Sequence, residues 1–104
     1  MHKGYKCVLA IVNNGFAEEA MEAARAAGAR GGTILHARGT TSKEAEKLFN
    51  ITIEPEKEIV MILAKSELTD AILSALYHAI GTSTNAQGIA FALPVDETVG
   101  LHKE

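Results

Sequence analysis

The stretch GTSTNAQGIAFALPV, from Gly81 to Val95, leaves a long apolar-periodic helix, crosses a polar loop and enters a hydrophobic strand. Residues 82–88 of the loop are all small or amide-bearing. Because few side chains block the approach, the backbone N–H groups of such a loop can converge on a ligand. We therefore expect one wall of a nucleotide or small-anion site here. An ordinary helix-to-strand connection is the alternative that spacing alone leaves open.

The hydrophobic pattern outward from this stretch predicts four strands and two helices. The strands are expected at Tyr5–Val12, Thr33–Arg38, Glu58–Lys65 and Ile89–Val95, and the helices at Phe16–Ala27 and Glu67–Ile80. Asn13–Gly15 and Ser66 are expected to cap the helix starts, and Gly28 and Gly81 to end them. The order strand, helix, strand, strand, helix, strand predicts a ferredoxin-like βαββαβ domain of the α+β class. Right-handed crossovers would place both helices on one face of a four-stranded antiparallel sheet.

Length and composition limit the class of protein. At 104 residues and 47% apolar, the chain is expected to fold as one domain over residues 1–104. A net charge of −3 argues against a nucleic-acid partner, which needs a basic surface. The single cysteine, Cys7, allows no disulfide within the chain and is interpreted as a buried, inert thiol, so a reducing, cytoplasmic location is expected.

The predicted strands are apolar on both sides, although helices can cover only one face of the sheet. Leu73, Tyr77 and Ile80 add a second apolar stripe to the second helix. A closed homo-oligomer that buries the open sheet face is the simplest arrangement that covers this surface.

No known catalytic motif occurs in the sequence: there is no P-loop, GxSxG, HExxH or CxxC. We therefore expect a protein that is not an enzyme. An acylphosphatase-like enzyme would need an arginine after the first strand, where residues 12–15 have none. The histidines lack metal-ligand spacing, and Glu54, Glu56 and Glu58 are interpreted as solvated charge. A small trimeric metal-binding, metal-tolerance-like protein using His36 or Cys7 stays open as an alternative.

The segment Thr40 to Lys57 is longer than most connections in compact domains. Its part from Ser42 to Phe49 could form a short helix. A functional loop and a plain hairpin extension are both compatible with its composition.

Two motifs carry a resemblance to a known family. The first is EEAMEAARAAGARGGTILHARG, Glu18 to Gly39, with its helix–Gly–x–x–Gly–x–Thr–strand–Gly order, and the second runs from Ala71 to Leu93. Together they make the chain similar to the PII signal-transduction (nitrogen regulatory protein PII) family, as a divergent member. The resemblance implies a homotrimeric regulator in nitrogen or carbon metabolism, with no tightly bound cofactor. An adenine nucleotide (ADP, AMP or ATP) would be its effector, bound in the clefts between subunits.

The resemblance also implies where the ligand and the partner bind. The ligand-binding residues would be Thr33, Gly39, Thr40, Thr41, Met61, Ile62, Leu63, Thr82, Ala86, Gln87 and Gly88. Residues 40–56 would form the T-loop, which contacts a partner enzyme or membrane transporter. This segment has no tyrosine, so the family's tyrosine modification is not expected.

The chain departs from the family pattern where phosphate is bound. The family's Gly-Asp-Gly-Lys run is Ala86-Gln87-Gly88-Ile89 here, and residues 96–104 contain no arginine. A triphosphate needs cations, and each missing charge-assisted bond costs about 1.5–3 kcal/mol. Nucleotides with fewer phosphates, or another small ligand, are therefore alternatives to ATP. The cations available as replacements are Arg30, Arg38, Lys43 and Lys65.

Overall fold

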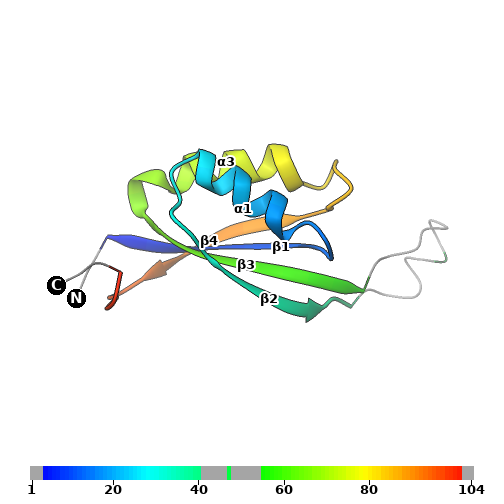
Figure 1. The fold of residues 1–104 in the computed structure, drawn as a ribbon, viewed down its shortest axis with the longest axis horizontal. Coiled ribbons are helices and arrows are strands. Elements are labelled where there is room, and N and C mark those ends of the chain that lie inside the picture. Colours follow the sequence, from blue (N-terminus) through cyan, green and yellow to red (C-terminus); the bar gives the residue numbers. More distant parts are fainter. Residues whose placement is uncertain (1–3, 41–46, 48–54, 102–104) are drawn as a thin grey trace.

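The computed structural model of the protein describes residues 4–40, 47 and 55–101. In chain order the elements are β1 (Tyr5–Asn13), α1 (Ala17–Ala26), β2 (Thr33–Arg38), β3 (Glu56–Lys65), the 3-10 turn η1 (Ser66–Leu68), α3 (Thr69–Ile80) and β4 (Ile89–Val95). Both helices lie on the same side of the sheet (Figure 1). The predicted ferredoxin-like fold is confirmed, and the bounds of β2 and β4 agree with the prediction.

The four strands form one antiparallel sheet in the order β2-β3-β1-β4. β1 is central, so it pairs with β3 on one side and with β4 on the other. The edges of the sheet are β2 and β4. This order matters for the site, because the residues of β2 and the loop that leads into β4 belong to opposite edges.

The core lies between the sheet and the two helices. Alternate residues of β1 and β3 point toward the helices and are at most 1% exposed: Val8, Ala10, Val12, Val60 and Ile62. They pack against Ala20 and Ala24 of α1 and against Ile72 and Leu76 of α3. The alanines let α1 lie close on the sheet, as its composition suggested.

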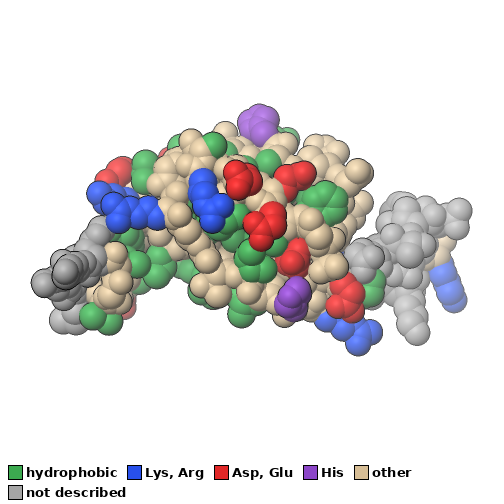
Figure 2. Space-filling model, viewed as in Figure 1, with side chains coloured by type: hydrophobic (Ala, Val, Ile, Leu, Met, Phe, Trp, Pro, Cys, Tyr) green, Lys and Arg blue, Asp and Glu red, His purple; other side chains and the backbone are tan. Residues whose placement is uncertain are grey.

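The opposite face of the sheet has no covering layer within the described chain. Its side chains are also apolar, and Met61, Leu63, Phe91 and Leu93 are between 39% and 46% exposed. In contrast, red carboxylate side chains gather over α1 on the helix side (Figure 2). We call the apolar surface formed by alternate residues of β1, β3 and β4 the open face.

The starts of both helices differ from the prediction. Ser66 does not cap a helix: it begins η1, and its hydroxyl donates to the Gly4 carbonyl over 2.9 Å. No side chain of Asn13–Gly15 caps α1. Instead the Glu58 carboxylate of β3 accepts from the N–H groups of Gly15 (2.7 Å) and Ala17 (3.2 Å). Glu58 is therefore not merely solvated charge, because it accepts from the first N–H of α1, a donor that a helix start leaves open, and from the turn before it.

Two further expectations need correction. Ile80 belongs to the core, at 1% exposed, whereas Tyr77, expected beside it in a second stripe, is 64% exposed. Helical periodicity alone placed both on one stripe, but the α3–β4 contact buries only Ile80. Cys7 is half-buried on the open face, not enclosed in the core.

Candidate functional site

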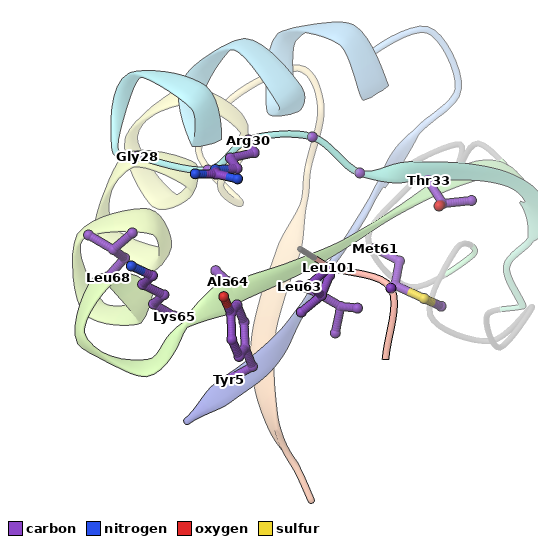
Figure 3. Close-up of a pocket in the computed structure, with 14 residues that line it drawn as sticks. Tyr5, Gly28, Arg30, Thr33, Met61, Leu63, Ala64, Lys65, Leu68 and Leu101 are labelled. Carbon is purple, nitrogen blue, oxygen red and sulfur yellow. The ribbon is translucent and has the colours of Figure 1, made fainter. Parts of the chain in front are cut away.

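One of two cavities described for residues 4–40 and 55–101, the larger of the two, has a volume of about 510 Å³. It lies between the α1–β2 connection, the second half of β3 and the residues Gly100 and Leu101 (Figure 3). Three of the predicted ligand-binding residues line it: Thr33, Met61 and Leu63. The connection runs close over β3, since a side chain added at Gly32 would come within 2.8 Å of the Met61 carbonyl oxygen. A Gly-rich segment lying on a strand leaves backbone groups and small side chains to shape this cavity.

The charged residues that line this cavity are both basic. Arg30 of the α1–β2 connection and Lys65 at the end of β3 contribute side chains, and no carboxylate is among the described lining residues. Tyr5, Leu68 and Leu101 supply apolar or aromatic surface. This combination of an apolar wall and two cations fits a small anionic ligand. Arg30 and Lys65 were two of four candidate cations, while nothing in the sequence pattern singled out Tyr5, Leu68 or Leu101.

The loop from Gly81 to Gly88 lines a second, smaller pocket of about 290 Å³. Thr82 and Gly88 contribute to it, together with Leu73 and Tyr77 of α3. Ala86 is fully buried, so its methyl group belongs to the core. Gln87 is exposed and takes a positive φ of 45°.

Several N–H groups of this loop are already bonded within the chain. Thr84 donates to the Gly81 carbonyl over 3.0 Å, Gln87 to Thr84 over 3.0 Å, and Gly88 to Ile80 over 2.6 Å. While these bonds are kept, those three groups are not available to a ligand. A side chain at Gly88 would also collide with the Ile80 carbonyl oxygen and come within 3.0 Å of Val12. The glycine at this position therefore has a packing role.

The predicted ligand-binding residues fall into two groups within one chain. One group belongs to the β2–β3 side and consists of Thr33, Gly39, Thr40, Met61 and Leu63. The other group precedes β4 and consists of Thr82, Ala86, Gln87 and Gly88. Ile62 points into the core and is 0% exposed, so only its backbone could meet a ligand. Thr41, Lys43 and most of the predicted T-loop lie outside the described residues, as does the helix expected at Ser42–Phe49 except for residue 47. Because β1 lies between β3 and β4, a single chain does not place Thr33, Met61 or Leu63 on a strand that pairs with β4.

The two candidate metal ligands are also separated. Cys7 pairs with Leu63 on the open face, whereas His36 pairs with Glu58, whose side chain points toward the helix side. Within the described residues there is no group of three or more His, Cys, Asp or Glu side chains that could hold a metal ion. Burial raises the pKa of the Cys7 thiol, which favours its protonated form.

The described part of the chain contains no helix that is both long and apolar enough to cross a membrane.

Solved structures with the same fold include PII proteins. The chain is similar to Arabidopsis thaliana PII bound to citrate, with a TM-score of 0.71 and 20% identity over 96% of this chain and 82% of that one. It is also similar to a functionally unknown protein from Pediococcus pentosaceus, with a TM-score of 0.68 and 17% identity over 96% and 100% of the two chains. A putative PII-like signaling protein from Thermus thermophilus gives a TM-score of 0.64 and 21% identity, over 86% and 83%. At these identities the structures establish the fold alone.

The sequence itself identifies the family. No curated protein is similar enough in sequence to this chain to count as a match. The model of the family described as Nitrogen regulatory protein P-II, however, matches residues 5–104, which include both motifs and both groups of predicted ligand-binding residues. The chain therefore belongs to the nitrogen regulatory protein P-II family.

Proposed function

We propose that this PII-like signalling protein is a cytoplasmic homotrimer that binds a small effector, an adenine nucleotide, at the junctions between its subunits. Binding at these junctions controls a partner enzyme or membrane transporter in nitrogen or carbon metabolism through residues 40–56. The protein itself catalyses no reaction and binds no nucleic acid. The observation that carries this proposal is the separation of the predicted ligand-binding residues into two groups, one on the β2–β3 side of central β1 and the other in the loop before β4.

The open face supports assembly. Apolar side chains are exposed on both strands that pair with central β1: Met61 and Leu63 on β3, and Phe91 and Leu93 on β4. Contiguous apolar patches of this kind are rare on monomers and usually mark an interface. Packing open faces around a common axis would bury them. It would also bring the β2–β3 side of one subunit near the β4 side of the next.

The charge of the larger cavity supports an anionic effector. Arg30 and Lys65 supply two cations to the surface that Thr33 and Leu63 also line. Citrate, bound to the Arabidopsis PII, is likewise a small anion. Two cations balance a monophosphate or diphosphate better than a triphosphate, so we expect AMP or ADP to bind more tightly than ATP.

Calorimetric titration with ADP, AMP, ATP, copper and zinc tests the choice of effector, and the solution mass tests the assembly. We expect heat with ADP or AMP and a mass of three chains of 11.0 kDa each. A mass of one chain at micromolar concentration would overturn the trimer. Heat with copper or zinc alone would overturn the nucleotide assignment and favour the metal-binding alternative.

Mixing two blocked variants tests whether the site is shared between subunits. Thr33 and Thr82 are both exposed, so a tyrosine at either position should fill its half of the site and leave the fold intact. Each variant, Thr33→Tyr or Thr82→Tyr, should bind no nucleotide alone. After unfolding and refolding together, about a quarter of the junctions should pair two intact halves and regain binding. Mixed trimers without any recovery would place the whole site within one chain.

A further inference from the structure

Three segments meet at the end of the sheet that leads into residues 40–56 (Figure 1). They are the stem of that segment, the turn after β1 and the Gly81–Gly88 loop. Gly39 and Pro55 close the stem, since the Gly39 N–H donates to the Pro55 carbonyl over 2.7 Å. Lys57 continues the stem on β3, and its side chain lies against Gly39, where an added Cβ would be 2.9 Å from the Lys57 Cε.

Asn13, the last residue of β1, touches both of the other segments. Its side-chain oxygen accepts from the Lys57 ammonium over 2.6 Å, and its side-chain amide donates to the Asn85 carbonyl over 3.1 Å. Its backbone N–H also donates to the Ala86 carbonyl over 2.9 Å. One planar amide group therefore bridges the stem and the Gly81–Gly88 loop, at the position where central β1 separates β3 from β4.

Neighbouring hydrogen bonds join the turn after β1 to residues of β3 next to the stem. The Asn14 N–H donates to the Glu56 carbonyl over 3.0 Å, and Glu58 receives the N–H groups of Gly15 and Ala17. These bonds hold the turn, so a shift of the stem moves the turn with it. The side-chain amide of Asn13 is the group that contacts both the Lys57 ammonium of the stem and the loop before β4.

We propose that Asn13 is a positioning residue that couples the Gly81–Gly88 loop to the stem of residues 40–56. The amide suits this role because it presents an acceptor to Lys57 and a donor to Asn85 at once, and no other side-chain group of that size does both with fixed geometry. A ligand that displaces the loop then changes the stem, and a partner that holds the stem changes the affinity of the ligand by the same factor. This second step rests on the proposed function, whereas the link between loop and stem does not.

Amide hydrogen exchange of the full-length protein without ligand tests the link. Lys57→Met keeps an unbranched chain that reaches the Cε position beside Gly39, with sulfur in place of Cδ, and removes the ammonium. We expect it to speed exchange of the Gln87 and Gly88 amides by about five-fold, as for the loss of one hydrogen bond. Arg25→Met, on the exposed surface of α1, is the matched control and should leave both amides unchanged.

A double-mutant cycle separates coupling from a general loosening of the structure. Asn13→Ala should speed exchange of the same amides, and Lys57→Met should then add nothing. Asn13→Asp keeps the acceptor for Lys57 but turns an oxygen toward the Asn85 carbonyl, so it should behave like Asn13→Ala at the loop. Additive effects of Lys57→Met and Asn13→Ala, or no effect of Lys57→Met, would overturn the proposal.

Titration with ADP extends the same cycle to the ligand. Neither Lys57 nor Asn13 is a predicted ligand-binding residue, yet Lys57→Met should change the dissociation constant of ADP about three-fold or more in the wild-type background and not in Asn13→Ala. If ADP does not bind at all, the proposed function fails while the exchange results still decide the link. Equal changes in the ADP dissociation constant in the wild-type and Asn13→Ala backgrounds would show that the contact between loop and stem does not affect ligand binding.

Discussion

The two faces of the sheet differ in environment although they are built from the same kinds of residues. On β3, Val60 and Ile62 point toward the helices and are fully buried, whereas Met61 and Leu63 point the other way and are 39% and 40% exposed. Periodicity and hydrophobicity do not distinguish these two sets. The difference teaches that one set completes a core within the chain, while the other stays exposed and is the surface that the proposed trimer would bury.

The largest expected effect is the loss of assembly on placing a charge in the open face. Phe91→Glu should leave the far-ultraviolet circular dichroism unchanged and reduce the solution mass from three chains to one of 11.0 kDa, because burying an unpaired carboxylate is costly. Tyr77→Glu, on the outer surface of α3 where the ring is 64% exposed, is the control and should keep the assembly. If Phe91→Glu keeps the mass of the wild type, the open face is not the interface.

The next effect concerns the covered face. Ile62→Ala should lower the free energy of unfolding by about 2–5 kcal/mol, since the helices close only part of the resulting cavity. Met61→Ala removes a side chain of similar size from the next position and the opposite face. Both losses are measured by urea denaturation at a protein concentration low enough to dissociate the proposed assembly. Met61→Ala should lower the free energy of unfolding clearly less than Ile62→Ala does. Equal losses would mean that the two faces do not differ within a single chain.

The smallest effect uses Cys7 to report on the open face. Burial raises the pKa of this thiol, so the reactive thiolate is scarce at neutral pH and becomes more abundant as the pH rises. Alkylation by iodoacetamide should therefore be slower than for the unfolded chain at pH 7 and should accelerate toward alkaline pH. In the Phe91→Glu variant it should be faster than in the wild type. Identical rates in the native and unfolded chains would show that the thiol is not shielded.

Much of the fold could be read from local patterns. Alternation and glycine punctuation predicted β2 and β4 with the bounds that the structure shows, and the order of elements predicted the topology. The helix starts were predicted wrongly because Ser66 and Asn13–Gly15 have the composition of caps. The first N–H of α1, that of Ala17, instead donates to Glu58, which is 41 residues away. A capping partner so distant leaves no local signal.

The candidate site was predictable to the extent that it depends on the family motif. Thr33, Met61 and Leu63 came from that resemblance, and the structure places all three on one cavity. Arg30 and Lys65 were only two members of a set of basic residues until the fold brought them to the same cavity. That the Gly81–Gly88 loop lies at the other edge of the sheet depends on strand order, which short motifs do not contain.

The sequence by itself determined the secondary structure, the family and the presence of more apolar surface than two helices can cover. These follow from interactions between residues close in the chain and from the amount of hydrophobic side chain. Only the tertiary structure decided which apolar residues stay exposed, and which distant polar groups meet. Asn13, Lys57 and Asn85 become partners because β1 lies between β3 and β4, and hydrogen bonds require atoms to lie within about 3 Å whatever their separation in sequence.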